Sequence, residues 1–489
     1  MPTVKIILCF PKNNAKARLL PMSLLMLAPL LKKAGFEVVV IDERMDEDWR
    51  RNLISLLEKG DVLMVGISVL TGQAITHALK ISEIVRQNSP AKVVWGGVHP
   101  SLLPEQTLAN DLIDFVVIGE GESTLLELAQ SLAGHGEISG INGIGYKKDG
   151  RIIINPSRPF IDLNQSERPS YELVDVERYV TKVSLGSGGT RRDIDFYTSR
   201  GCPYRCGFCY NQNFNRSRWR GQSAQKVVEH MEYLVDKFGV TLLDIEDDEF
   251  FIDKERVMDI CRLLEEKKLN LEIVACHRVD LFGKVSAEEL DQLRRAGFRN
   301  LVFGVESGSP RILKLIRKDI ACEQVLAAVE KLKAARIGSK YCFMVGFPEE
   351  TLADIYQTTD LILAMKKINP NILIPPWRIY TPYPGTDLYE SSIKQGFVPP
   401  ARLEDWANFD FENINMPWIG KQRRKIIANI TFFFPFVGLS EIKESGLYLK
   451  LGRWYGKTVD WRWRHHWFNF VPEKTLVKLW LRLKDHSKK

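Results

Sequence analysis

The feature that most constrains the fold of this chain is a repeated alternation of short apolar runs with amphipathic helical stretches. In the first 135 residues, the apolar runs are residues 4–9, 37–41, 62–68, 92–95 and 115–118. Segments with helical periodicity lie between them, at residues 23–34, 49–58 and 73–86. Strands and helices that alternate at this interval are typical of βαβ units, in which helices cover both faces of a parallel sheet. We therefore predict an α/β first domain over residues 1–140.

A second alternating series runs from residue 194 to about residue 396. Its expected strands are residues 195–198, 241–245, 272–275, 300–304, 339–345 and 373–380. Helical patterns separate them, at residues 224–237, 256–267, 287–296, 323–335 and 352–365. Six strand–helix units are too few to close an eight-stranded barrel, so we predict a partial (β/α)6 barrel of the TIM type over residues 191–400. Residues 141–190 have weak periodicity and are predicted to be a connector with one hairpin at Asp149 and Gly150.

Composition excludes several other classes of protein. The chain has 489 residues, of which 45% are hydrophobic and 26% charged, so it is neither disordered nor collagenous. No apolar run reaches the ~20 residues of a membrane helix, and the first residues lack the pattern of a signal peptide. Eight cysteines in a chain of this length do not indicate a disulfide scaffold. We expect a cytoplasmic protein.

The basic charge is concentrated in the C-terminal extension, residues 401–489. Residues 420–489 contain 16 Lys and Arg against five Asp and Glu, although the net charge of the whole chain is only +7. Aromatic residues are interleaved with the basic ones. This pattern fits a helical cap that closes the open barrel, or a peripheral contact with a membrane surface or a lipid substrate. Binding of nucleic acid is the least favoured of the three interpretations.

Three of the cysteines form a cluster directly after the first expected strand of the second series. Cys202, Cys206 and Cys209 lie in the segment GCPYRCGFCY, residues 201–210. Three thiolates from one loop suit zinc or an iron–sulfur cluster. A structural zinc site requires a fourth Cys or His, and none lies at the expected spacing. A 4Fe-4S cluster with three protein ligands keeps one iron open for a further ligand.

The CxxxCxΦC spacing, with Phe208 before the last cysteine, resembles the signature of the radical S-adenosylmethionine (radical SAM) superfamily. The resemblance covers roughly residues 190–400. It implies that Cys202, Cys206 and Cys209 hold a 4Fe-4S cluster whose open iron chelates S-adenosylmethionine. It further implies reductive cleavage to a 5′-deoxyadenosyl radical that abstracts hydrogen from the substrate. Reduced flavodoxin or ferredoxin is the expected electron donor.

Further segments resemble the superfamily's contacts with S-adenosylmethionine, in the same order along the chain. They are the acidic segment 243–250, segment 304–309 at the fourth strand, and segment 343–350 at the fifth, which resembles the segment that packs against adenine. The PxPGT loop at 380–386 resembles a structural turn beside the substrate opening. A solvated acidic turn is the alternative for the carboxylates, and an ion pair with Asp280 is the alternative for Arg278. The implied contacts are Phe208, Glu246, Asp247, Asp248, Arg278, Glu306, Ser307 and Gly346.

Glycine and small polar residues follow three expected strands of the first domain, in segments 68–72, 96–100 and 119–122. Such residues let the backbone approach a ligand closely, although tight turns are a simpler interpretation. The absence of GxGxxG after the first strand argues against a dinucleotide site. Beside the radical SAM motifs, residues 1–140 resemble a Rossmann-like cobalamin-binding domain. The implied contacts are Pro21, Ser68, Val69, Leu70, Thr71, Gly96, Gly97, His99, Gly119, Glu120 and Gly121.

The cobalt-ligating motif DxHxxG is absent, so neither His77 nor His99 is expected to bind cobalt, and lower coordination is expected to be weak or absent. Together the resemblances imply a cobalamin-dependent radical SAM methyltransferase that acts on an unactivated carbon of a small, hydrophobic molecule. The alternative is a non-methylating cyclase or carbon–carbon coupling enzyme that acts on a lipid or tetrapyrrole. A cobalamin or redox sensor without turnover is a third hypothesis, which the complete radical-initiating motifs disfavour.

Overall fold

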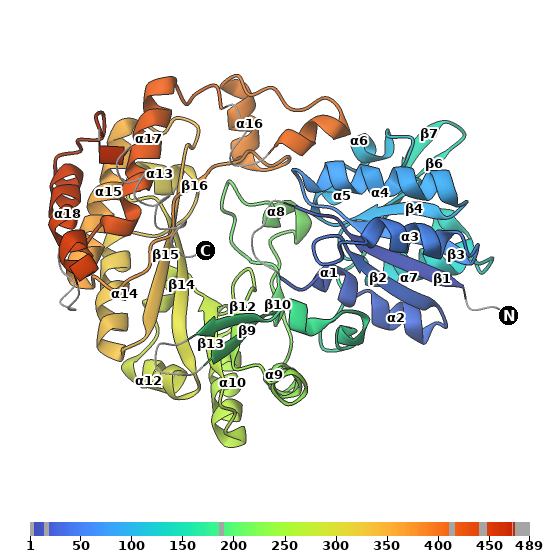
Figure 1. Ribbon diagram of the computed structural model, residues 1–489, viewed down its shortest axis with the longest axis horizontal. Coiled ribbons are helices and arrows are strands. Elements are labelled where there is room, and N and C mark those ends of the chain that lie inside the picture. The colour runs from blue at the N-terminus through green and yellow to red at the C-terminus, as the bar shows by residue number, and fades with distance from the viewer. Residues whose placement is uncertain are drawn as a thin grey trace.

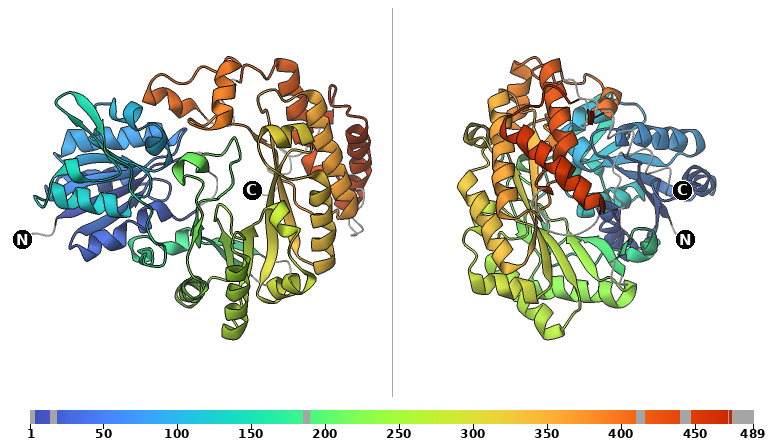
Figure 2. Two further views of the ribbon diagram at one scale, coloured as in Figure 1. Left: turned by 180° about the vertical axis from the view of Figure 1, so that it is seen from behind. Right: turned by 60° about the vertical axis from the view of Figure 1, so that its left-hand side comes forward.

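The computed structural model describes residues 4–13, 19–184, 190–409, 416–439, 447–471 and 473–474. Two α/β units lie side by side, and a helical C-terminal extension covers the outer face of the second unit (Figures 1 and 2). The predicted fold class, a Rossmann-like unit followed by a partial barrel and a helical extension, is confirmed.

The first unit is built on a seven-stranded sheet with the order β2-β1-β3-β4-β5-β6-β7. Its strands are β1 (Lys5–Phe10), β2 (Glu37–Asp42), β3 (Val62–Ser68), β4 (Lys92–Gly96), β5 (Phe115–Val117), β6 (Ile144–Lys148) and β7 (Arg151–Ile154). Its helices are α1 (Met22–Leu25), α2 (Ala28–Lys33), α3 (Trp49–Leu57), α4 (Ala74–Asn88), α5 (Val98–Leu102), α6 (Pro104–Leu108) and α7 (Glu122–Leu132). Because neighbouring residues of a strand face opposite sides, Ile6 and Ile7 enter two separate apolar layers.

The second unit has a curled sheet with the order β16-β15-β14-β13-β12-β9-β8 (Figure 1). Its strands are β8 (Thr181–Ser184), β9 (Thr190–Phe196), β12 (Leu242–Ile245), β13 (Glu272–Cys276), β14 (Phe298–Glu306), β15 (Gly338–Val345) and β16 (Arg378–Ile379). The principal helices are α9 (Ala224–Phe238), α10 (Lys254–Lys267), α12 (Ala287–Arg295), α14 (Cys322–Ala335), α15 (Leu352–Ile368) and α16 (Asp387–Lys394). Strands β9 and β12–β16 are parallel, which gives the six predicted barrel strands.

The sixth barrel strand is shorter than the predicted segment 373–380. Only Arg378 and Ile379 form β16, and Leu373 contributes an isolated bridge to Lys340. Pro375 and Pro376 interrupt the segment between them. Since proline has no backbone N–H to donate to a neighbouring strand, the ladder cannot continue through these two positions.

The predicted connector, residues 141–190, supplies strands to both sheets. The hairpin at Asp149 and Gly150 is confirmed, with both residues at positive φ, and its strands β6 and β7 extend the first sheet. Strand β8 pairs antiparallel with β9 and extends the second sheet. The connector therefore ties the two units together through backbone hydrogen bonds at each end.

The described part of the C-terminal extension consists mainly of α17 (Lys421–Phe433) and α18 (Leu447–Arg464). Its aromatic residues divide into two groups. Phe433, Phe434, Trp463 and Phe468 are buried in the apolar core of the second unit, as a cap requires, whereas Trp454, Trp461, Trp467 and Phe470 are exposed. None of the described helices combines the length and apolarity needed to cross a membrane. Residues 475–489 of the predicted extension lie outside the described residues.

A segment of the extension, residues 397–409, crosses from the barrel to the first unit and is called the strap here (Figure 1, orange). It contains the short 3-10 helix η4 (Leu403–Asn408), which packs on α4. The indole Nε1 of Trp406 donates a hydrogen bond of 2.7 Å to Gln106 Oε1, and Gln106 Nε2 donates to the carbonyl oxygen of Pro400. Phe397, Leu403, Trp406 and Phe409 complete one apolar layer of the first unit.

We expect Trp406→Ala to destabilise the first unit by about 3–5 kcal/mol, because the indole is only 1% exposed and its removal leaves a cavity. Denaturant unfolding followed by circular dichroism measures the loss. Trp454→Ala, at a residue that is 73% exposed, is the matched control and changes stability by less than about 0.5 kcal/mol. Equal effects of the two substitutions would show that the strap does not support the first unit.

Candidate functional site

The three clustered cysteines lie on a loop that closes at its base. Two short strands, β10 (Ser199–Arg200) and β11 (Arg220–Gly221), pair antiparallel on either side of it, with Arg200 opposite Arg220. Gly201 has φ +83°, and a Cβ atom there would lie 2.0 Å from the carbonyl oxygen of Arg218. Only glycine fits this position, since any side chain would collide with the returning strand. The loop, residues 201–219, is called the cysteine loop.

Contacts with the barrel hold the middle of the cysteine loop. The backbone N–H of Gly207 donates to the carbonyl oxygen of Ile316, and the carbonyl oxygen of Gly207 accepts from Leu388 N–H. Cys206 is buried, and Cys202 and Cys209 are partly exposed. Phe208 packs with its ring centroid 6.1 Å from that of Phe347. The loop thus has a defined place at the carboxyl ends of the barrel strands.

The three thiols are soft sulfur donors carried by one loop, the type of ligand that iron–sulfur clusters take. Burial raises the pKa of Cys202 to about 11 and that of Cys209 to about 12, so both are thiols at neutral pH. A bound metal centre supplies the positive charge that stabilises thiolates. The donor set therefore fits an iron–sulfur cluster. Within the described residues, no three His, Cys, Asp or Glu side chains are arranged around a single metal ion.

Arg278 is the cation directed at the cysteines. Its Nη1 lies 3.8 Å from the sulfur of Cys206, and its Nη2 donates to the carbonyl oxygen of Lys318. The ion pair with Asp280, anticipated as an alternative role, is present at 2.9 Å, and the guanidinium also lies 3.6 Å from the ring centroid of Tyr204. Arg278 is buried, so it supplies a fixed positive charge beside the loop.

The three carboxylates predicted after the second barrel strand differ in their surroundings. Glu246 and Asp248 are exposed at the end of β12, and Asp248 Oδ2 accepts a hydrogen bond from Gly201 N–H. Asp247 is buried, and its carboxylate accepts three hydrogen bonds from Thr198 and Ser199. These bonds tie the start of β10 to the segment after β12, which leaves Glu246 and Asp248 as the carboxylates available to a ligand.

The fourth-strand motif contains a buried ion pair whose two charged groups lie against a glycine, Gly304. Glu306 has φ +69°, and its Oε1 lies 3.0 Å from Lys318 Nζ. A Cβ atom on Gly304 would lie 2.5 Å from the same oxygen, so glycine makes room for the pair. Ser307 is buried and close to Thr358. No sequence motif surrounds Lys318, so its ion pair with Glu306 could not be predicted from the sequence.

Gly346, predicted to lie beside adenine, is the contact point between the fifth strand and the C-terminal extension. It has φ +89°, its N–H donates to Glu350 Oε2, and its carbonyl oxygen accepts from Trp418 Nε1 at 3.0 Å. Burial raises the pKa of Glu350 to about 8. The extension thus reaches the rim of the barrel mouth.

Glu249 and His277 form a buried pair that the sequence did not single out. Glu249 Oε1 lies 3.8 Å from His277 Nδ1, and neither ring nitrogen has a hydrogen-bond partner among the described residues. Burial raises the pKa of Glu249 to about 8 and lowers that of His277 to about 3. Both groups are therefore largely neutral at pH 7, and Glu249 lies near enough to Cys202 for a negative charge on it to raise the pKa of that thiol.

In the first unit, the predicted ligand residues gather at the carboxyl ends of the parallel strands. Val69 N–H donates to the carbonyl oxygen of Gly96, and His99 N–H donates to that of Val69. Gly97 has φ +97°, and a Cβ atom there would lie 2.9 Å from Val69 O. Glycine thus lets two loops interlock. The same edge carries Pro21, Ser68, Leu70, Thr71, Gly119, Glu120 and Gly121.

His99 is buried at this edge, and burial lowers its pKa to about 4, so its imidazole is neutral at pH 7. Its Nδ1 lies 3.0 Å from Thr71 Oγ1, and its ring meets that of Trp406 edge-on. Nε2 has no hydrogen-bond partner among the described residues. His77 pairs instead with Glu43, at 2.6 Å. Neutral, small and glycine-rich surroundings fit a large cofactor held by packing and backbone contacts.

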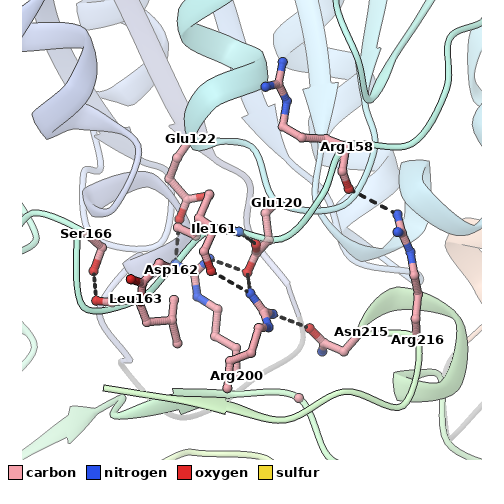
Figure 3. Close-up of polar contacts among 12 residues, drawn as sticks. Glu120, Glu122, Arg158, Ile161, Asp162, Leu163, Ser166, Arg200, Asn215 and Arg216 are labelled. Atoms are coloured by element: carbon pink, nitrogen blue, oxygen red, sulfur yellow. Dashed lines mark hydrogen bonds and ion pairs between the residues drawn. The ribbon is translucent and has the colours of Figure 1, made fainter. Parts of the chain in front are cut away.

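Four charged side chains, called the clamp here, join the cysteine loop to the first unit (Figure 3). Glu120 Oε1 lies 2.9 Å from Arg200 Nη1 and 2.8 Å from Arg220 Nη1, and Glu122 lies 2.6 Å from Arg200 Nη2. Ile161 N–H donates to the other oxygen of Glu120. Burial alone would raise the pKa of Glu120, but the two arginines hold it below its usual value.

The clamp gives Glu120 a partner that its motif did not reveal. The carboxylate is expected to contact the cofactor, and it is also shared between the two arginines at the base of the cysteine loop. Arg200 and Arg220 were not predicted as site residues. Their symmetric positions around the cysteines are the one local signal, but their partners lie 80 to 100 residues away.

Comparisons with known proteins agree with both units. The Radical SAM superfamily profile matches residues 196–362, and the B12 binding domain profile matches residues 11–129. An uncharacterized methyltransferase of Pyrococcus horikoshii is 31% identical over 459 residues, which cover 91% of this chain and 96% of the relative. The anaerobic magnesium-protoporphyrin IX monomethyl ester cyclase of Synechocystis sp. is 26% identical, over 71% of this chain and 69% of the cyclase.

Among solved structures, the radical S-adenosylmethionine methyltransferase TsrM from Kitasatospora setae, with cobalamin and a 4Fe-4S cluster bound, has the same fold. The TM-score is 0.69 at 18% identity, and the match covers 95% of this chain and 100% of that one.

We expect Glu120→Gln to weaken the contact between the units by about 2–3 kcal/mol, because Arg220 loses its carboxylate and Arg200 keeps only Glu122. The lowered pKa means that Glu120 contributes this stability above the usual carboxyl pKa and loses it as pH falls through the lower folded value. The gap in unfolding free energy between wild type and variant should therefore be constant from pH 8 to about pH 5 and close below about pH 4. Glu83→Gln, at an exposed carboxylate of α4, is the control and should leave stability unchanged at every pH.

Proposed function

Because the chain belongs to the cobalamin-binding radical SAM enzymes, we propose that it transfers a methyl group to an unactivated carbon of a small molecule. The observation that carries this proposal is the clamp, which joins the cysteine loop directly to the ligand edge of the first unit. Methyl transfer between two bound cofactors requires that both face one reaction space. Two relatives named as methyltransferases match over nearly the whole chain.

When bound, cobalamin would supply a methyl group taken from one S-adenosylmethionine, which leaves as S-adenosylhomocysteine. The cluster would supply the electron that splits a second S-adenosylmethionine, whose products are methionine and, after hydrogen abstraction, 5′-deoxyadenosine. The substrate carbon would thereby exchange one hydrogen atom for the methyl group. In this proposal Cys202, Cys206 and Cys209 hold the cluster, and Arg278 holds positive charge beside Cys206.

The proposed S-adenosylmethionine contacts line the barrel mouth. Glu246 and Asp248 are exposed and accept hydrogen bonds from an amino group, and the Glu306–Lys318 pair offers both an acceptor and a donor. Phe208 and Gly346 provide the apolar and backbone walls. At the opposite edge, segments 68–71 and 96–99, with Pro21 and Gly119–Gly121 beside them, pack against cobalamin. His99 stays neutral and hydrogen-bonded to Thr71 in this arrangement.

The finer assignments are part of the same proposal. The domains are residues 1–140, 141–190, 191–400 and 401–489, and the electron donor is a reduced flavodoxin or ferredoxin. The exposed Trp454, Trp461, Trp467 and Phe470, in a basic segment, support peripheral contact with an anionic membrane surface and a hydrophobic or lipid-like substrate.

A cyclase or carbon–carbon coupling reaction on a tetrapyrrole is the second candidate. The Synechocystis cyclase supports it, since the relative shares both units at 26% identity. Methylation is favoured because the methyltransferase relative is more similar and covers more of the chain.

Anaerobic incubation of the reconstituted protein with cobalamin, S-adenosylmethionine and a strong reductant tests the proposal without the substrate. Mass spectrometry should detect 5′-deoxyadenosine, S-adenosylhomocysteine and methylated cobalamin together. Cys206→Ala should abolish 5′-deoxyadenosine, because one cluster ligand is missing, whereas Cys261→Ala in the buried face of α10 should keep it. Deoxyadenosine with cobalamin that is never methylated would instead support the cyclase or coupling reaction.

A further inference from the structure

A cavity of about 370 Å³ lies between the two units. The first unit contributes Ser101 and Gly119, at the ligand edge of its sheet. The second contributes α8 (Asn211–Phe214), which follows the cysteines, and Pro384 of the PxPGT loop. Residues 157–160 of the connector form a further wall. The volume is at the lower end of the range for small-molecule sites, and the position is where the two proposed cofactor sites meet.

Three charged residues line this cavity, and two of them are neutralised by neighbours. Glu120 is held by the arginines of the clamp. The guanidinium of Arg158 forms an ion pair with Glu127 and donates a hydrogen bond to Thr124 Oγ1. Arg216 is the third, and among the described residues no carboxylate lies within ion-pair distance of it. Its positive charge is therefore left for a ligand.

Arg216 is held in a defined position. Its Nη2 donates to the carbonyl oxygen of Arg158 at 3.4 Å, as Figure 3 shows, and its guanidinium lies 5.0 Å from the ring centroid of Phe160. Arg216 and Ser217 both have φ +51°, a left-handed conformation that costs a non-glycine residue free energy. One long hydrogen bond leaves the other guanidinium N–H groups available to acceptors from a ligand.

The remaining walls combine polar and apolar residues. Ser101, Ser157 and Asn213 offer polar groups, and Pro159, Phe160, Phe214 and Pro384 offer apolar surface. A guanidinium against such walls binds a carboxylate or phosphate through charge-assisted, bidentate hydrogen bonds, while the rings and prolines cover an apolar body. A neutral ligand of the same shape would leave the arginine without an anionic partner.

We propose that this cavity binds the anionic group, a carboxylate or a phosphate, of a small organic ligand, and that Arg216 is its counter-ion. The proposal deepens the methyltransferase proposal and rests on it, since it describes the ligand at the junction of the two cofactor sites. The anionic group has two sources: an acidic substrate, or the phosphate in the nucleotide tail of cobalamin.

Binding of phenyl phosphate, benzoate and the neutral benzamide to the full chain, followed by ligand-observed NMR, tests the site without catalysis. Wild type should bind the two anions more tightly than benzamide. Arg216→Gln should weaken the binding of phenyl phosphate at least tenfold and leave the binding of benzamide unchanged. Arg216→Lys keeps the charge and should retain part of the affinity. Arg218→Gln removes an equal charge from an exposed position two residues away and should have no effect.

Corrinoid titrations separate the two sources. If the anion is the nucleotide phosphate, Arg216→Gln should weaken the binding of hydroxocobalamin but not that of dicyanocobinamide, which lacks the nucleotide. Hydroxocobalamin should then also displace phenyl phosphate. If the anion instead belongs to an acidic substrate, both corrinoids should bind the variant as tightly as wild type. Phenyl phosphate should then still bind the hydroxocobalamin-loaded protein.

Equal affinity of wild type and Arg216→Gln for phenyl phosphate, or an equal loss in Arg218→Gln, would overturn the proposal. Formation of 5′-deoxyadenosine is measured without this ligand, so its failure would count against the methyltransferase proposal separately.

Discussion

The arrangement of the two units depends on the ion pairs that Glu120 and Glu122 form with Arg200 and Arg220. A carboxylate shared by two arginines is stable away from water only while all of its partners are present, because each lost partner leaves a buried charge behind. The arginines flank the cysteine loop on its two sides, Glu122 is the first residue of α7, and Glu120 lies two residues before it. One cluster of charges therefore sets the position of the cysteines relative to the loops of the first sheet.

The same pairing decides the electrostatics of the space between the units. Four arginines, Arg158, Arg200, Arg216 and Arg220, face three glutamates there, Glu120, Glu122 and Glu127. Deeper in the barrel, the carboxyl group of Glu249 and the imidazole of His277 are kept neutral by burial, and Glu306 is balanced by Lys318. Arg216 is the member of this set with no carboxylate at ion-pair distance among the described residues, so the unbalanced positive charge of the set lies at the junction of the units and not in the barrel core.

Sequence reasoning located the parallel strands and the cysteine loop because their signals are local. Apolar runs mark buried strands, and closely spaced cysteines mark a common loop. It failed where a residue's role is set by a distant partner or by local backbone chemistry. The expected cofactor contact of Glu120 gave no sign of its ion pairs with arginines 80 and 100 residues away, and Pro375 and Pro376 shorten the sixth strand. Lys318, His277 and Trp406 acquire their roles from contacts that no spacing encodes.

The strap has a consequence for how the chain matures. Its apolar side chains complete a core layer of the first unit, yet they follow α7 by more than 260 residues. At about 5–20 residues per second, a ribosome needs on the order of tens of seconds to synthesise that interval. During this time α4 lacks its cover and His99 lacks Trp406, so the ligand edge of the first unit is unfinished. The ligand edge of the first unit is therefore complete only after synthesis has passed residue 409.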